Sequence, residues 1–538
     1  MNKIKYIRYS IWLLAVFAAA FSFWGYFKTG VLSDTFGDAY TAVNSGLVEK
    51  LTNDLQFIDA NRYRPVLFIT LKSIVSFSSL LGIAYDNFII YKTVNLLLYL
   101  ILAFLSGYFV LKITGDLIKS VLTEIFILLY PNNLHNLFWS AAYFEILCAV
   151  FCILTLLLAV KFIMCRRLRF LVYSNTFFVL ALLTKETAVP LPFICAVIVF
   201  LFYGRTVFAG KKIILISQTA ILTLYFFAKT LLSRGIPVIS GEYFGNDFFG
   251  VSVQVIFKAF ISLIIPFDYS VIRFSIKEFN PGVTAYIIII SIISVYYIYS
   301  FIKNGKISKL FLIVAVLLLS VSPYIYAGYI RPQLILIPFT FTLISLMSFL
   351  DSKEILLKYS VLLVLILWIP SGYGVLDSWK TAHSKGKERL ESLLKTDLPP
   401  GKKYLIIGNP SRLQQSFMYD NIMFPYNYFK YHSYVLKDTI SDAIRTAALD
   451  KNSLDAVIDV RQPVDNEFEL TCTGKTQFFY LDGNEKLIKE ENGLKSKLFE
   501  ADYLEFNDLG KPVKIKLKLL SDSLICYIFR GSNIEKMK

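Results

Sequence analysis

The chain has 538 residues, of which 56% are hydrophobic, and its mean hydropathy is +0.58. A soluble protein of this length would form several domains with a much lower apolar fraction. Most of the formal net charge of +16 lies in the first 374 residues, because residues 375–538 hold 25 Lys and Arg against 23 Asp and Glu. Positive charge in short loops between apolar runs indicates membrane orientation and headgroup contact rather than a nucleic-acid-binding face.

The first 374 residues contain repeated apolar runs of about 17 to 25 residues, the length that crosses a hydrocarbon core. The N-terminal run has the basic start of a signal peptide, but more runs follow, so we predict an uncleaved first helix. The other predicted spans are 87–110, 120–138, 142–162, 170–184, 187–203, 213–231, 283–302, 309–328, 332–350 and 356–374. The predicted fold class is therefore a polytopic α-helical membrane protein with about 11 transmembrane helices.

Two further apolar stretches, 66–84 and 251–267, each contain a lysine, Lys72 and Lys258. If both crossed the membrane, three of the basic loops would move to the outer side, against the positive-inside bias. We therefore predict that both are outer interfacial helices. The N-terminus is then cytoplasmic, the protein lies in the plasma (inner) membrane, and external loops cover about residues 28–86 and 232–282.

Residues 375–538 differ in composition from the membrane domain, which we place at residues 1–374. The segments "KKYLIIGNP" and "LDAVIDV" are typical of buried strands, and "TQFFYLDGN" and "VKIKLKLL" of strands bounded by turns. We predict a soluble extracytoplasmic α/β domain. Export would allow Cys472 and Cys526 to pair, whereas the other four cysteines lie in or beside apolar runs as core residues.

Several ionisable residues fall on the predicted outer side, where they are candidates for function. Asp34 and Asp38 follow the first helix, and a carboxylate at the membrane edge can serve as a general base for a hydroxyl group. The alternative is two solvated loop carboxylates, one of them a helix cap. Arg64 precedes Pro65, which favours an extended backbone, and its guanidinium would bind a phosphate or anchor the chain to headgroups.

The remaining candidates follow the same pattern. Glu145 is predicted in the first turn of a helix that starts outside, where an acidic residue is favourable in any case. Lys185 and Glu186 lie in a hairpin between two apolar runs, where a structural ion pair is the alternative interpretation. Arg273 lies in the second external loop, and Arg331 at the outer start of a late span. We expect an external cationic rim around one or two carboxylates, suited to an anionic substrate held in the membrane. The predicted rim consists of Arg64, Lys185, Arg273 and Arg331.

Five motifs in this order resemble those of the GT-C superfamily of integral-membrane glycosyltransferases, particularly the branch related to protein O-mannosyltransferases. They are "SDTFGD", "YRPV", "WSAAYFEIL", "TKETAVPLP" and "RPQLILIP", and the resemblance covers about residues 1–350. The acid pair is spaced Asp-x-x-x-Asp here rather than adjacent, so either Asp34 or Asp38 could take the catalytic place. The chain has no Asp-x-Asp motif of the metal-dependent oligosaccharyltransferases.

The resemblance implies an inverting transfer of a hexosyl or pentosyl group from a polyprenyl-phosphate carrier to an acceptor hydroxyl on the outer face. Asp34 or Asp38 would deprotonate the acceptor, which is a protein, lipid or glycan of the cell envelope. The donor site would be formed by Arg64, Glu145, Lys185, Glu186, Arg273 and Arg331. We predict no cofactor and no protein-bound metal, although the sequence leaves a divalent metal open.

Two other functions keep the membrane and the lipid-linked sugar. A polysaccharide polymerase or ligase usually places its external arginines in a large loop between late spans, whereas here the first loop holds much of the polar content. A flippase or other transporter should show polar or broken helices at mid-membrane and often an internal repeat. The predicted crowding of charges at the outer boundary favours the transferase over both.

Overall fold

The computed structural model describes most of the apolar part of the chain and the strands that follow it. The described residues are 25–28, 46, 64–83, 89–139, 142–203, 208–232, 248–266, 272, 281–350, 355–396, 403–413, 416–417, 440–448, 458–464, 466–473, 477–480, 488–490, 493–495, 499–506, 512–520, 524–530 and 533–537. They divide into two compact units, a helical one that ends at Tyr373 and a second one that contains Gly374–Lys538.

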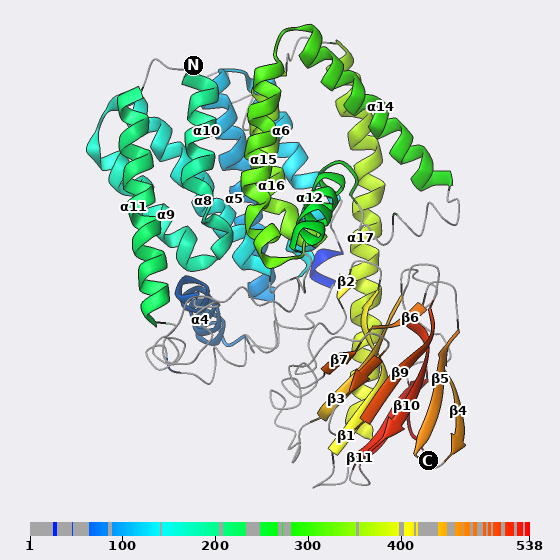
Figure 1. Cartoon of the computed structure of the whole chain (residues 1–538). Coiled ribbons are helices and arrows are strands. Elements are labelled where there is room, and N and C mark those ends of the chain that lie inside the picture. Colours follow the sequence, from blue (N-terminus) through cyan, green and yellow to red (C-terminus); the bar gives the residue numbers. More distant parts are fainter. Residues whose placement is uncertain are drawn as a thin grey trace. The chain divides into compact units, whose positions relative to one another are not determined.

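The helical unit follows the apolar runs of the sequence (Figure 1). Its α-helices are α4 Pro65–Leu80, α5 Ile89–Thr114, α6 Leu117–Leu129, α7 Pro131–Phe138, α8 Tyr143–Cys165, α9 Leu168–Thr184, α10 Leu191–Tyr203, α11 Phe208–Leu232, α12 Phe248–Ile264, α14 Pro281–Lys303, α15 Ile307–Ala327, α16 Leu336–Met347 and the first part of α17 Ile355–Lys395. The short 3-10 helices η4 Glu186–Ala188 and η5 Pro332–Ile335 precede α10 and α16, and η1 Tyr26–Lys28 belongs to the second unit.

Among the described residues, five helical segments are long and apolar enough to cross a membrane. They are Ile89–Thr114, Tyr143–Cys165, Lys212–Thr230, Pro281–Ser300 and Ile307–Ala327. The stretches that the sequence left ambiguous form α4 and α12, of 16 and 17 residues. Their length is short for a span and compatible with the predicted interfacial placement, which stays a prediction.

One predicted span is broken. Residues 120–138 were expected to form a single helix, but α6 ends at Leu129 and α7 begins at Pro131, with Tyr130 extended between them (φ −66°, ψ 117°). Proline has no N–H to continue the hydrogen-bond ladder and disfavours the helical conformation of the residue before it. Pro131 therefore marked the break in the sequence, but the apolar run was long enough to be predicted as one helix.

Helix α7 is a polar element inside the helical unit, with all eight residues buried. Its asparagine amides bond to the main chain of other elements, because a helix end in an apolar environment leaves carbonyl groups that need donors. The side chains of Asn132, Asn133 and Asn136 donate to the carbonyl oxygens of Ser262, Ile127 and Gln333, at 2.9, 3.2 and 2.7 Å. Helix α7 thus ties together α12, α6 and η5.

The second unit contains the C-terminal part of α17 and two six-stranded sheets. The strands are β1 Lys403–Leu413, β2 Ser416–Phe417, β3 Ile440–Ala448, β4 Ile458–Val464, β5 Glu467–Cys472, β6 Gln477–Tyr480, β7 Ile488–Glu490, β8 Gly493–Lys495, β9 Phe499–Phe506, β10 Pro512–Leu519, β11 Leu524–Arg530 and β12 Asn533–Lys536. The first sheet has the order β12-β11-β1-β3-β6, with β2 paired to β1, and the second has the order β4-β5-β10-β9-β8-β7. β1 is parallel to both β11 and β3, whereas the second sheet is antiparallel.

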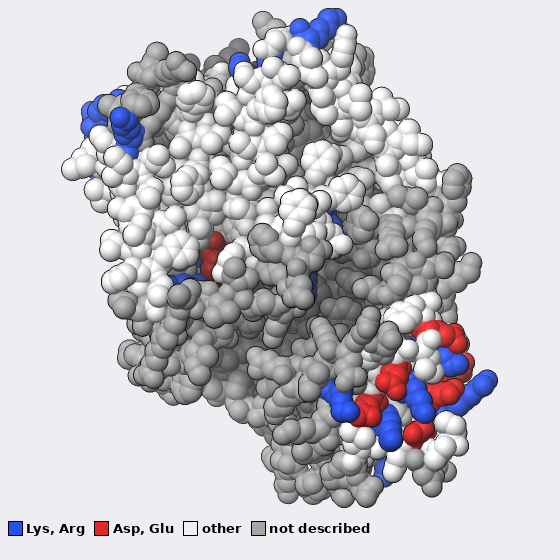
Figure 2. Space-filling model, viewed as in Figure 1, with Lys and Arg blue, Asp and Glu red and all other residues white. Residues whose placement is uncertain are grey.

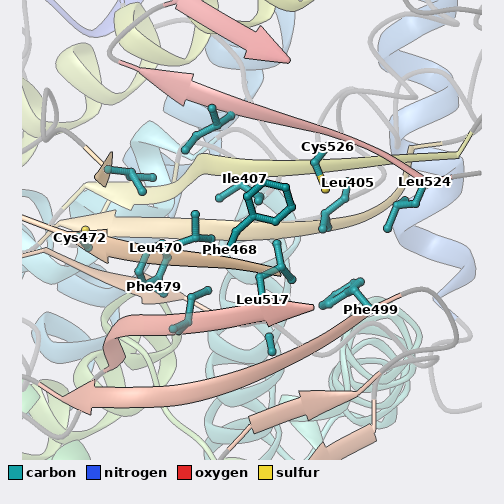
Figure 3. Close-up of a cluster of buried hydrophobic side chains, with 14 residues drawn as sticks. Leu405, Ile407, Phe468, Leu470, Cys472, Phe479, Phe499, Leu517, Leu524 and Cys526 are labelled. Atoms are coloured by element: carbon teal, nitrogen blue, oxygen red, sulfur yellow. The ribbon is translucent and has the colours of Figure 1, made fainter. Parts of the chain in front are cut away.

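The hydrophobic core of this unit consists of residues from both sheets (Figure 3). Leu405 and Ile407 of β1 pack in one cluster with Leu470 of β5 and Leu517 of β10, and all four are fully buried. The segments expected to contain strands overlap β1, β4, β6 and β10. Among the described residues every element after α17 is a strand. The C-terminal part of α17 is therefore the one described helix of the expected α/β domain. Its Arg389 side chain donates to the carbonyl of Gly408 in β1 at 2.9 Å.

The six cysteines are free. Cys472 and Cys526 lie buried in the core of the second unit, and burial raises the pKa of each thiol to about 12. A thiol with so high a pKa is a poor nucleophile and behaves as a small apolar side chain.

Candidate functional site

The strongest concentration of buried charge among the described residues is built where α4, α8, the α9–η4 hairpin and α11 meet. Arg64 is the cap residue of α4, with a non-helical backbone (φ −132°, ψ 67°), and Pro65 occupies the first helical position. Its Nη2 lies 2.9 Å from Oε2 of Glu186, and its Nε donates to the same oxygen at 3.3 Å. Residues 122 positions apart in the sequence are therefore joined by a charge-assisted contact.

Lys185 and Glu186 do not pair with each other. Lys185 ends α9 in an extended conformation (φ −161°, ψ 144°), so consecutive side chains of the hairpin point in different directions. The Lys185 ammonium pairs with Glu145, which lies in the first turn of α8 as the sequence predicted. Lys185 is 8% exposed and Glu145 1%, so the pair is almost entirely removed from water.

The first turn of α8 organises both cations. The Arg64 guanidinium lies 5.5 Å and the Lys185 ammonium 4.9 Å from the centroid of the Phe144 ring. The face of an aromatic ring attracts positive charge. Beside it, the Tyr143 hydroxyl donates to the carbonyl of Leu67 in α4 at 2.9 Å. Residues 143, 144 and 145 thus hold the start of α4 and the two cations in one arrangement.

A third cation comes from Lys229 in the last turn of α11, which the sequence analysis did not select. Its Nζ lies 3.7 Å from Oε1 of Glu186, and its side chain is 12% exposed. A lysine at the end of an apolar helix is usually an anchor in the headgroup region. The feature of the sequence that could have indicated Lys229 is its place near the outer end of the predicted span 213–231, on the same side of the membrane as Arg64 and Glu186.

We call Arg64, Glu145, Lys185, Glu186 and Lys229 the charge cluster. It contains three basic and two acidic side chains, a formal surplus of one positive charge. Burial, and then the nearby Arg64, hold the pKa of Lys185 well below its ordinary value. Burial raises the pKa of the Glu186 carboxyl, but Arg64, and more weakly Lys229, outweigh this effect and hold that pKa below its ordinary value. Glu186 is therefore ionised at neutral pH.

The other predicted site residues are placed as follows. Arg331 precedes η5 and its guanidinium lies 5.5 Å from the centroid of the Tyr329 ring, while Tyr329 also interacts electrostatically with Arg64. Asp34, Asp38 and Arg273 lie outside the described residues, so the candidate base and one arm of the predicted rim stay predictions.

The opposite end of the same helices carries basic side chains. Helix α8 begins with Glu145 in its first turn and is followed by Arg166 and Arg167, both exposed, about 30 Å along the helix axis. Lys306 is the cap residue at the start of α15, and Lys309 lies in the first turn of that helix. The Lys306 ammonium donates to the Phe349 carbonyl at 3.4 Å, and the Lys309 ammonium lies 4.8 Å from the centroid of the Phe349 ring. In Figure 2 blue patches of this kind lie at the edge of a largely uncharged surface.

The residues that the structure describes contain no group of three or more His, Cys, Asp and Glu that could hold a metal ion. The carboxylates of the charge cluster are each engaged by a cation, Glu145 by Lys185 and Glu186 by Arg64. The donor set of this site therefore suits an anion.

Comparison with protein-family models and with curated proteins finds no match. Among solved structures, the chain is similar to the archaeal oligosaccharyltransferase AglB from Archaeoglobus fulgidus in complex with an inhibitory peptide and a dolichol-phosphate, with a TM-score of 0.39 and 10% identity. The similarity covers 75% of this chain and 62% of that chain, so this chain spans less than two thirds of the length of its structural neighbour. A similarity this distant carries no argument about function, and we derive the function from the residues of the site.

Proposed function

We propose that the protein is an inverting glycosyltransferase that moves a sugar from a polyprenyl-phosphate carrier to an acceptor hydroxyl on the outer face of the membrane. The observation that carries the proposal is the charge cluster, in which three basic side chains meet two acidic ones at one end of the apolar helices. A sugar linked through one phosphate to a lipid is a phosphodiester with a single negative charge. Its headgroup lies at the depth where such helices end.

The buried position of the cluster supports binding of a phosphate rather than simple anchoring. Taking an ion pair such as Lys185–Glu145 out of water is costly, so its presence at this buried position favours a functional role over a stabilising one. Arg64 offers a planar set of donors suited to phosphate oxygens. Phe144 and Tyr143 hold these groups in place before a substrate arrives.

The reaction balances with these groups. Asp34 or Asp38 removes the proton of the acceptor hydroxyl, and the oxygen attacks the anomeric carbon on the face opposite the phosphate. The bond between the anomeric carbon and the phosphate oxygen breaks, the configuration inverts, and the lipid phosphate leaves with an additional negative charge. Arg64 and Lys185 stabilise that charge as it develops.

The test uses membranes that contain the full-length protein and a polyprenyl-phosphate sugar with a radiolabelled sugar. Asp34→Asn and Asp38→Asn are made separately, with Asp459→Asn of β4, an exposed aspartate, as the matched control. Loss of the base should lower transfer about 10²- to 10⁴-fold for one of the two aspartates. Unchanged transfer in both variants would show that neither aspartate is the base.

The same assay separates the proposed transferase from a transporter. A transferase consumes the labelled donor and leaves unlabelled lipid phosphate in the membrane. A protein reconstituted in vesicles that moved the intact labelled lipid to the other leaflet without consuming it would contradict the proposal.

A further inference from the structure

Helix α11 brings a second residue to the charge cluster. Tyr225 lies one turn before Lys229, and residues four apart occupy the same face of a helix. The Lys229 Nζ lies 5.7 Å from the centroid of the Tyr225 ring, and Tyr225 interacts electrostatically with Glu186 and with Arg64. The two side chains therefore form one stripe that faces the cluster.

The Tyr225 hydroxyl of this stripe is not saturated by the cluster. The Tyr225 hydroxyl is buried and has no hydrogen-bond partner among the described residues. An unused hydroxyl donor in a buried position costs free energy unless something else uses it. The Lys229 ammonium, which carries three donors, lies 3.7 Å from Oε1 of Glu186 on the same side of the cluster.

A purely structural role does not account for this arrangement. Arg64 alone already neutralises Glu186 with a 2.9 Å contact, and a second, partly buried cation beside the same carboxylate adds a desolvation cost. A tyrosine and a lysine on one face, with an arginine across from them, form a set of donors that converges on an anion.

We infer that Tyr225 and Lys229 form the second half of a phosphate site whose first half is Arg64. They bind the non-bridging oxygens of a phosphate ester, through the Tyr225 hydroxyl and the Lys229 ammonium. The inference rests on the proposed function, since it assigns two further residues to the binding of the carrier phosphate.

Binding of farnesyl phosphate to the purified full-length protein, followed by isothermal titration calorimetry in detergent, tests the inference. Farnesol and inorganic phosphate are the parallel probes, which separate the lipid chain from the phosphate. Lys229→Gln should weaken farnesyl phosphate binding about tenfold, because it removes a positive charge beside the phosphate. Tyr225→Phe should weaken it about threefold, because it removes one hydrogen bond to a charged group. Farnesol binding should stay within about twofold in both variants.

Two matched control variants change a lysine and a tyrosine that are exposed on the helices away from the charge cluster. Lys212→Gln changes an exposed lysine near the other end of α11, and Tyr173→Phe changes a tyrosine of α9 that is 53% exposed. Both should bind farnesyl phosphate within about twofold of the unmodified protein. Thermal unfolding of each variant verifies that the helices are intact.

The outcomes separate the two claims. If the unmodified protein binds farnesyl phosphate and the α11 variants bind it equally well, the stripe is structural and the inference falls while the proposed function stands. If the α11 variants lose farnesol binding to the same extent, their effect is on the lipid chain or the fold, which also contradicts the inference. If the unmodified protein does not bind farnesyl phosphate, the inference and the proposed function fall together. Equal binding of inorganic phosphate with the same losses would assign the site to free phosphate rather than a lipid headgroup.

Discussion

Both units of the molecule contain Lys–Glu ion pairs, but these pairs differ in how far they are exposed to water. In the helical unit, Lys185 and Glu145 meet with side chains 10% and 2% exposed, inside a surface that is largely uncharged (Figure 2). In the second sheet, Lys516 and Glu467 pair at 2.8 Å across neighbouring strands, but with side chains 38% and 21% exposed, among interleaved positive and negative groups. A pair in water contributes little, whereas a pair in an apolar interior is costly to form and costly to break.

This difference indicates where to look for function. The charged face of the second sheet follows from strand alternation, because every second residue of β10 points to solvent and lysine is well solvated there. No such rule places three cations and two carboxylates inside a helical bundle. The charge cluster is therefore the feature that requires an explanation beyond the fold.

The largest expected effect comes from breaking the most deeply buried pair. Lys185→Gln leaves the Glu145 carboxylate buried without its cation, which should lower the free energy of unfolding by about 3–5 kcal/mol. Chemical unfolding in detergent measures it. The double variant Lys185→Gln/Glu145→Gln removes both charges and should recover most of the stability but not the glycosyl transfer. Full recovery of transfer in the double variant would mean that the pair serves only the fold.

The sequence predicted parts of this arrangement and not others. The apolar runs indicated where α4 and α8 begin, and Pro65 marked the start of α4. Arg64 and Glu145 were selected because both fall on the predicted outer side of the membrane. Strand patterns located β1, β6 and β10 because alternation and turn residues are local signals.

The partners of the charges were not predictable in the same way. Lys185 pairs with a residue 40 positions away rather than with its neighbour, and Glu186 with one 122 positions away. Such pairings depend on how helices pack, which run length and hydropathy do not encode. Lys229 was missed for the same reason, because at the end of α11 it resembles an ordinary interfacial anchor.

A second prediction concerns pH. Because Arg64 and Lys229 lower the pKa of Glu186, its ionised form stabilises the folded protein above the ordinary range of a glutamate pKa. That contribution, about 1.5–3 kcal/mol for a hydrogen bond to a charged group, is lost as the pH falls through the lowered pKa. Glu186→Gln should therefore unfold with a weaker dependence on pH in the acidic range. Parallel acid-unfolding curves for the two proteins would contradict the assignment.

A third prediction concerns the buried asparagines of α7, which are polar but uncharged. Asn136→Ala removes the donor that contacts the Gln333 carbonyl at 2.7 Å and should cost about 1–2 kcal/mol, because a buried acceptor is left without its partner. Asn304→Ala, at an exposed position after α14, is the matched control and should leave the stability unchanged. Since η5 follows Arg331, the Asn136 variant should also raise the KM for the lipid-linked donor. An unchanged KM would separate α7 from the substrate site.

The smallest effect is expected where the ion pairs are most numerous. Lys516→Gln breaks the 2.8 Å contact with Glu467, and that contact lowers the pKa of the glutamate. Both groups are solvated, and Lys514 and Lys518 lie on the same strand, so the remaining charges redistribute around the glutamate. We expect the thermal midpoint to move by no more than the error of the measurement, and any shift to vanish at high salt. A loss comparable to that of Lys185→Gln, or one insensitive to salt, would mean that the charged face of the second sheet is buried against a partner, and the contrast between the two units would then disappear.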